Sequence, residues 1–249
     1  GFFVHGALSG INRAVFEEAN ALGSVRAETS TRGPGEDYFI RLETEYPAEH
    51  LCSVLDTLGG VGYYRGGAAR GRELCHGGFT TALGKEVEQL LQTRKRIFDG
   101  EIQRLRTNGP HTTGRIQWFD VEERFRPMGV KMIGVFCTEI RNMDFLDPGK
   151  YLAGFQTLPD EVPGFGFINF GAKKISMRVS DHLTGEIRAG RMPGLSDFLP
   201  EATIRLGGFA DACHGLSAAT TVSRGREKKL MEETDRVLER ELEKIERAE

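Results

Sequence analysis

The chain has 249 residues, of which 28% are charged and 39% hydrophobic, and its formal net charge is −3. These values are typical of a soluble globular protein with one or two domains. They argue against a basic coat of the kind found on many nucleic-acid-binding proteins, although they are compatible with a local basic groove. No apolar run reaches the roughly 20 residues that a membrane-spanning helix requires, so we expect no membrane partner.

The first part of the chain alternates between strand-like and helical patterns. Strands are expected at Phe2–His5, Val25–Thr31, Tyr38–Tyr46 and Val61–Arg65, with a turn at Arg32–Asp37. Helices are expected at Ile11–Leu22 and Pro47–Leu58, where apolar residues recur at helical spacing and Gly59-Gly60 ends the second helix. This βαββαβ order is that of a ferredoxin-like sandwich of one sheet and two helices.

In element order, residues 1–84 also resemble an ACT domain, a small module that often dimerises or binds amino acids. Gly6–Gly10 stands where many ACT domains carry an Asp-x-Pro-Gly turn. We therefore expect a module that is either structural or forms a homodimer, rather than an amino-acid sensor.

The segment Gly62–Arg72 gathers two tyrosines, three arginines and four glycines within a short stretch. Tyrosine rings can stack on bases while arginines bind phosphates, which makes Tyr64, Arg65, Arg70 and Arg72 candidate nucleic-acid contacts. The alternative has equal weight: a glycine-rich hinge whose arginines are solvated and whose tyrosines pack on the sheet.

Lys85–Arg106 is predicted to be a long amphipathic helix, and Asn108-Gly109-Pro110 should end it. Its arginines and lysines are compatible with a nucleic-acid channel, but a charged helix face is more often simply solvated. We treat residues 85–111 as a connecting helix and linker between two domains.

Residues 112–249 predict an α/β or α+β domain, because strand-like and helical patterns alternate. Strands are expected at Arg115–Val121, Tyr151–Thr157, Lys174–Ser180 and Leu216–Val222. Leu183–Ala189 and Gly225–Glu249 should be helices, Leu158–Gly166 a loop, and Gly129–Ile140 either a buried strand or a helix.

Two segments of this domain indicate a site for phosphate. Lys173–Arg178 is a short strand that ends in an arginine, which offers a charge and a planar fork of donors. Gly207-Gly208 is a turn whose glycines would let backbone N–H groups approach an anion, and His214 follows it.

These two segments resemble the DHHA1 domain, the C-terminal half of the DHH phosphoesterases. Lys174-Ile175-Ser176-Met177-Arg178 is similar to the Lys-Val-Ser-Leu-Arg strand of that domain. Gly207-Gly208 with Ala218-Ala219-Thr220 is similar to its Gly-Gly-His…Ala-Ala-Gly segment, and the closing helix also fits. The wider resemblance, over residues 112–249, is to archaeal RecJ-like nucleases.

The resemblance implies that Arg178, Gly207 and Gly208 bind a substrate phosphate. The histidine of the family motif falls at Phe209, which cannot donate a hydrogen bond, and His214 is the candidate to replace it, as a phosphate ligand or as the one catalytic candidate. The family also implies manganese or magnesium held by an N-terminal domain. No Asp-His-His motif is present, since Asp181-His182 lacks the second histidine, so we expect the metal ligands outside this chain.

The cysteines Cys52, Cys75, Cys137 and Cys213 form no Cys-x-x-Cys pair and predict reduced thiols in a cytoplasmic protein. A zinc site joining Cys75-His76 to Cys213-His214 is a less favoured alternative, because metal-site spacing is absent. The chain begins at Gly1 rather than Met, and we expect it to be a fragment or a processed form of a longer protein.

The sequence as a whole predicts the substrate-binding part of a RecJ-like, metal-dependent phosphoesterase that acts on single-stranded nucleic acid or short oligonucleotides. A replication or repair scaffold without catalysis is the first alternative. The second is an RNA-binding appendage of the kind that closes many alanyl-tRNA synthetases.

Overall fold

A computed structural model of the chain describes residues 10–31 and 36–247, with side chains from residue 14 onward. The chain divides into two compact units, Gly1–Arg94 and Lys95–Glu249, which are described separately below. The helix α4 (Thr81–Asn108) contributes residues to both. The predicted strand Phe2–His5 and residues 32–35 of the predicted turn lie outside the described part.

The first unit begins with α1 (Gly10–Ala21), which confirms the predicted helix there. A three-stranded antiparallel sheet follows, in the order β1 (Val25–Thr29), β2 (Glu36–Arg41) and β3 (Glu45–Pro47). The run Tyr38–Tyr46 is therefore two strands of a hairpin rather than one strand. The second predicted helix is confirmed as α2 (Ala48–Asp56).

The predicted strand Val61–Arg65 is wrong, because this segment is helical. The helix α2 continues without a break into the π-helical turn η1 (Thr57–Val61), so Gly59-Gly60 does not end it. The 3-10 turn η2 (Tyr63–Arg65) and α3 (Gly67–Gly77) follow. A Cβ atom at Gly67 would lie 1.9 Å from the Leu58 carbonyl oxygen, so only glycine allows the chain to fold back on η1.

A short apolar run such as this one has no clear period, so its pattern does not separate a strand from a helix. In the structure Val61 and Gly62 are the buried residues of this run, and Val61 lies in the core together with Leu58 of the preceding helical turn. The described sheet runs in chain order, and no strand follows α2 in the described part of the first unit. The ferredoxin-like order, and the ACT-like homodimer that it implied, therefore have no support in the described residues.

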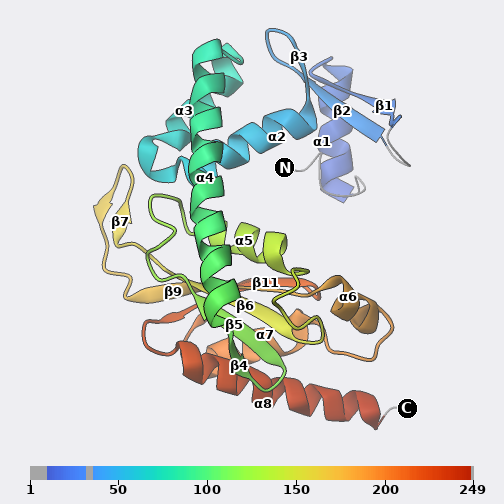
Figure 1. The fold of residues 1–249 in the computed structure, drawn as a ribbon. Coiled ribbons are helices and arrows are strands. Elements are labelled where there is room, and N and C mark those ends of the chain that lie inside the picture. Colours follow the sequence, from blue (N-terminus) through green and yellow to red (C-terminus); the bar gives the residue numbers. More distant parts are fainter. Residues whose placement is uncertain (1–9, 32–35, 248–249) are drawn as a thin grey trace. The chain divides into compact units, whose positions relative to one another are not determined.

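The second unit is a mixed α/β fold around a six-stranded sheet (Figure 1). The strand order is β10-β11-β9-β6-β5-β4, in which only β5 and β6 run parallel. The strands are β4 (His111–Thr113), β5 (Ile116–Asp120), β6 (Tyr151–Thr157), β9 (Ala172–Arg178), β10 (Phe209–Cys213) and β11 (Ser217–Ser223). The strands predicted at Arg115–Val121, Tyr151–Thr157, Lys174–Ser180 and Leu216–Val222 are confirmed to within two residues.

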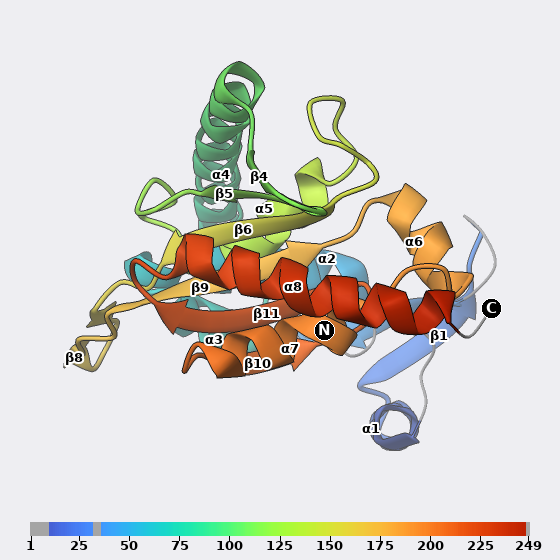
Figure 2. The ribbon, with the colours of Figure 1, turned by 90° about the horizontal axis from the view of Figure 1, so that it is seen from below.

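Helices cover the two faces of this sheet unequally. One face packs against α7 (Leu195–Arg205) and α8 (Glu227–Glu246), as seen in Figure 2, where α8 lies across the strands. Alternate residues of the strands point to this side and form the main core, including Phe155, Ile175 and Met177. The opposite face packs against the short helix α5 (Met132–Ile140), which contacts β6 and β9. The segment Gly129–Ile140 is thus a helix and not a strand.

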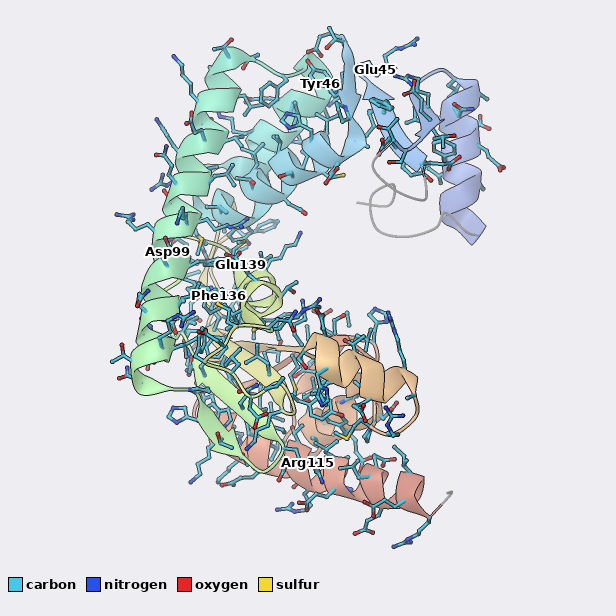
Figure 3. The ribbon with its side chains drawn as sticks, turned by 45° about the vertical axis from the view of Figure 1, so that its right-hand side comes forward. Glu45, Tyr46, Asp99, Arg115, Phe136 and Glu139 are labelled. Atoms are coloured by element: carbon cyan, nitrogen blue, oxygen red, sulfur yellow. The ribbon has the colours of Figure 1, made fainter. Side chains whose placement is uncertain are left out.

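Aromatic side chains fill the space around α5. The ring of Phe136, labelled in Figure 3, lies 4.8 Å from that of Phe98 on α4 and 5.1 Å from that of Phe125, measured between centroids. All three side chains are fully buried. On the sheet below, Gly154 lets α5 approach closely, because a Cβ atom there would lie 2.6 Å from the Cys137 sulfur.

Replacing Gly154 with alanine should lower the free energy of unfolding by about 1–3 kcal/mol, because the rigid packing of α5 leaves no room for a methyl group. The fluorescence of Trp118, the single tryptophan, reports on this unit and can follow unfolding in urea. Gly185→Ala in α6 (Asp181–Arg188) is the matched control, since a Cβ atom there meets nothing within 4 Å. The control should be stabilised by about 0.5–1 kcal/mol, and equal destabilisation of both variants would contradict the packing argument.

Sequence patterns do not reveal α3 or the elements that lie between α6 and β11. The helix α7 contains Pro200, which discourages a helical assignment, yet its buried residues Leu195, Phe198, Leu199 and Ala202 have helical spacing. The strand β10 is short and made mostly of small residues, so it has no pattern of its own. The predicted loop Leu158–Gly166 contains part of a small exposed hairpin, β7 (Glu161–Val162) and β8 (Gly166–Phe167).

Candidate phosphate-binding face

The helix α5 contacts β6 and β9 on its side of the sheet, and we call the side chains that β9, β11 and β10 present on this side the open face. Residues two apart along a strand point to the same side, so the register of the strands arranges this face in three rows. A β-bulge between Ala210 and Ala212 brings Phe209 and Ala212 to the same side. The rows are Arg178 with Ser217, Ser176 with Ala219 and Ala212, and Lys174 with Thr221 and Phe209.

Arg178 lies at the end of β9 and at one edge of the open face. Its Nε donates to the Thr138 hydroxyl at 2.9 Å and its Nη1 donates to the Met177 carbonyl at 2.8 Å. Gly134 leaves room for the guanidinium, since a Cβ atom at Gly134 would lie 3.0 Å from Nη2. The neighbouring helix α5 therefore fixes the orientation of this side chain.

Among the described residues, no carboxylate lies within ion-pair distance of Arg178. Partial burial lowers the pKa of its guanidinium, and the charge of nearby Arg141 lowers it further. A cation that has lost part of its hydration without gaining an anion is costly in an unliganded protein. Such a group is a candidate for binding an external anion, because the ligand would supply the missing charge.

Arg141 itself is held by the start of α6. Its guanidinium pairs with Asp181 at 3.1 Å, and Asn142 donates to the same carboxylate at 2.9 Å. The Asn142 side-chain oxygen in turn accepts the backbone N–H of Asp181 at 2.9 Å. Asp181 is thus occupied in joining α5 to α6.

His214 lies at the same end of the sheet as Arg178. Its backbone N–H donates to the Ser217 carbonyl at 2.8 Å and closes the turn between β10 and β11. Ser217 is the register partner of Arg178. The imidazole is exposed and has no hydrogen-bonding partner in the described part of the chain. The structure thus brings together two of the four residues that the sequence assigned to phosphate.

Gly207 and Gly208 lie at the opposite end. They precede β10, whereas His214 follows it, and five residues of strand separate the two ends by about 17 Å. Their N–H groups are also engaged, because Gly207 donates to Ile204 and Gly208 to Thr203, both at 2.9 Å. These bonds cap the C-terminus of α7, with Gly207 in the left-handed region at φ +69°. One phosphate cannot contact both this turn and Arg178.

Gly208 has a packing role that a substitution can test. A Cβ atom there would lie 2.5 Å from the Thr221 carbonyl oxygen and 2.7 Å from the Thr203 methyl group. Gly208→Ala should therefore lower the free energy of unfolding by about 1–3 kcal/mol, while the folded protein keeps its affinity for phosphate. Gly207→Asn is the control, since asparagine tolerates the left-handed conformation and should cost less. Loss of phosphate affinity in a stably folded Gly208→Ala protein would show that the Gly207-Gly208 turn does contribute to phosphate binding.

In the ranges that the structure describes, no group of three histidine, cysteine, aspartate or glutamate side chains could hold a metal ion. Three aspartates of the second unit form ion pairs with cationic side chains instead: Asp120 pairs with Lys173, Asp144 with Arg106, and Asp211 with Lys174. All four cysteines are free thiols. None of the described helices is long and apolar enough to cross a membrane.

The candidate nucleic-acid contacts of the first unit are on helical segments rather than on a flexible loop. The rings of Tyr63 and Tyr64 pack edge to face with centroids 4.9 Å apart. Arg70 pairs with Glu73 at 2.7 Å and with Glu86 at 3.3 Å, so its charge is compensated. Arg65 and Arg72 are exposed.

Comparison with known proteins gives weak structural likenesses. No family model matches the sequence, and no curated protein matches it. The C-Ala domain of Aquifex aeolicus alanyl-tRNA synthetase aligns with 52% of this chain and 96% of its own, at 8% identity and a TM-score of 0.36. A DHH-domain protein described as a member of a family of ribosomal proteins aligns at 10% identity and a TM-score of 0.37, over 69% of this chain.

The third protein is the pGpG-specific phosphodiesterase PggH of Vibrio cholerae, with 14% identity and a TM-score of 0.36 over 80% of this chain. The chain spans 34% of the length of the DHH-domain protein and 59% of that of PggH. Similarities this low do not assign the chain to a family or to a function.

Proposed function

We propose that the open face binds the phosphate backbone of single-stranded nucleic acid or of short oligonucleotides, as the substrate-binding part of a RecJ-like, metal-dependent phosphoesterase. The observation that supports this most is the uncompensated guanidinium of Arg178. Only Nε and Nη1 donate hydrogen bonds to described residues, so the guanidinium keeps further N–H groups for phosphate oxygens. His214 at the same end would add a second donor.

Manganese or magnesium would lower the pKa of an attacking water and offset charge on the phosphate. The described residues do not fit such an ion, and we therefore route no catalytic step through them. In this proposal their part is to bind and position the phosphate, and the metal ligands belong to a separate partner domain.

The proposal is tested by titrating a fluorescein-labelled single-stranded oligonucleotide with the 249-residue chain at several salt concentrations. We expect saturable binding that weakens with salt, because phosphate contacts release counterions. Inorganic phosphate should compete. Absence of binding at low salt would overturn the proposal.

Two alternatives remain, and each has its own assay. Manganese-dependent release of nucleotides, measured with the proposed metal-binding domain present, would separate a phosphoesterase from a scaffold that has lost catalysis. Preferential binding of tRNA over single-stranded DNA would favour an RNA-binding appendage. Phe209 in place of a histidine favours the scaffold slightly.

A further inference from the structure

The open face has two unlike ends. Arg178 lies in the first row, and Phe209 lies in the third row at the start of β10. The first and third rows are four residues apart along the strands, so the distance between them is about 13 Å. In the middle row between them, Ser176 is buried next to Gly134 of α5, whereas the small side chains of Ala219 and Ala212 are accessible. Because alanine side chains are short, no large side chain of the middle row stands between the two ends on β11 and β10.

Phe209 is unusually exposed for a phenylalanine. Its exposed fraction is 69%, although β10 belongs to the main sheet of the unit. The helix α7 packs on β10 and β11 from the opposite face, where it contributes to the core. The ring of Phe209 is therefore presented on the uncovered side, and it contacts no other aromatic ring of the described chain.

The charges on the open face differ between its two ends. Lys174, in the same row as Phe209, forms an ion pair with Asp211. The cation at this end is thus already compensated, and an incoming phosphate would meet the carboxylate of Asp211. The uncompensated cation lies at the other end, at Arg178. A phosphate is consequently favoured beside Arg178, and an uncharged aromatic group is favoured beside Phe209.

We propose that Phe209 is a base-stacking platform, and that the open face binds a single strand with a phosphate at Arg178 and a base on the Phe209 ring. The inference rests on the proposed function and adds the position of the base. Every base has a flat face, so this contact would bind without strong sequence preference. A protein partner docking on Phe209 is the competing occupant.

The test compares two probes that share a phosphate and differ in the base. One is a short fluorescein-labelled single-stranded oligonucleotide, and the other is ribose 5-phosphate, measured as its competitor. Phe209→Ala should weaken oligonucleotide binding about five- to 100-fold, which is the usual range for loss of one stacked base. It should leave the affinity for ribose 5-phosphate within about twofold of the unsubstituted value, because the phosphate stays at Arg178.

Ile204→Ala is the matched control, since Ile204 is 64% exposed on α7, the helix that packs on the opposite face. Phe209→Tyr should retain binding, because its ring can still stack. Unchanged oligonucleotide affinity in Phe209→Ala would overturn the inference and favour a protein partner. The proposed function would still stand in that case if Arg178→Ala weakens oligonucleotide binding. An equal loss for both probes would also overturn it, and failure of the unsubstituted chain to bind would overturn both proposals.

Discussion

Arg178→Ala should weaken the binding of a short single-stranded oligonucleotide by about 10- to 100-fold, the largest effect on binding that we expect from one substitution. The guanidinium is held by Thr138 and by the Met177 carbonyl, and no described carboxylate shares it. Its loss would remove a phosphate contact, so the slope of log affinity against log salt should become shallower by about 0.7. Fluorescence anisotropy at several salt concentrations measures both quantities.

Two further variants make this result interpretable. Arg178→Lys keeps the charge but loses the planar fork, so its affinity should fall between those of the original and the alanine protein. Arg205→Ala is the control, because Arg205 on α7 pairs with Glu201 at 2.6 Å and with Glu233 at 2.8 Å. An Arg178→Ala protein with unchanged affinity and unchanged salt slope would remove this residue from the site.

Lys173→Met should lower the free energy of unfolding by about 3 kcal/mol, the largest effect on stability that we expect. Lys173 forms ion pairs with Asp120, at the end of β5, and with Glu227 at 3.2 Å, at the start of α8. The side chain of Lys173 is only 10% exposed, and those of Asp120 and Glu227 are 18% and 14% exposed. Methionine would leave two largely buried carboxylates without a cation, and urea unfolding followed by Trp118 fluorescence measures the cost.

The exposed pair of Lys228 with Glu232, at 3.8 Å, supplies the control. Lys228→Met should change stability by less than about 0.5 kcal/mol, because solvent screens this pair. Equal effects of the two substitutions would show that the buried network contributes no more than a surface pair.

The network also predicts a pH window. Burial alone would lower the pKa of Lys173, but Asp120 and Glu227 outweigh it and raise that pKa above 10.5. Burial alone would raise the pKa of Glu227, but hydrogen bonds from backbone N–H groups and from Lys173 lower it below 4.5. The stability supplied by the network should therefore be complete between these two values, and be lost as the pH rises through the folded pKa of Lys173 or falls through that of Glu227. Urea unfolding repeated from below pH 4.5 to above pH 10.5 measures this window.

Parts of the candidate site could be predicted from the sequence and parts could not. The strand ending in Arg178 is predictable because its residues alternate and its neighbours are apolar. His214 is a candidate only by its type and its distance from a glycine pair. The assignment of that pair to phosphate is not supported, since a turn that binds an anion and a turn that caps a helix have the same composition. Because the sequence pattern does not predict α7, it does not show that this turn caps a helix.

The sequence by itself determined the mixed α/β class, most strands of the main sheet, the long helix α4 and the closing helix α8, because each depends on a local pattern or on composition. Only the tertiary structure decided which residues share a site. The register of β10 on β11, and the bulge within β10, place His214 near Arg178 and put Phe209 on the same face. Such pairing depends on residues far apart in the chain, and no local period encodes it.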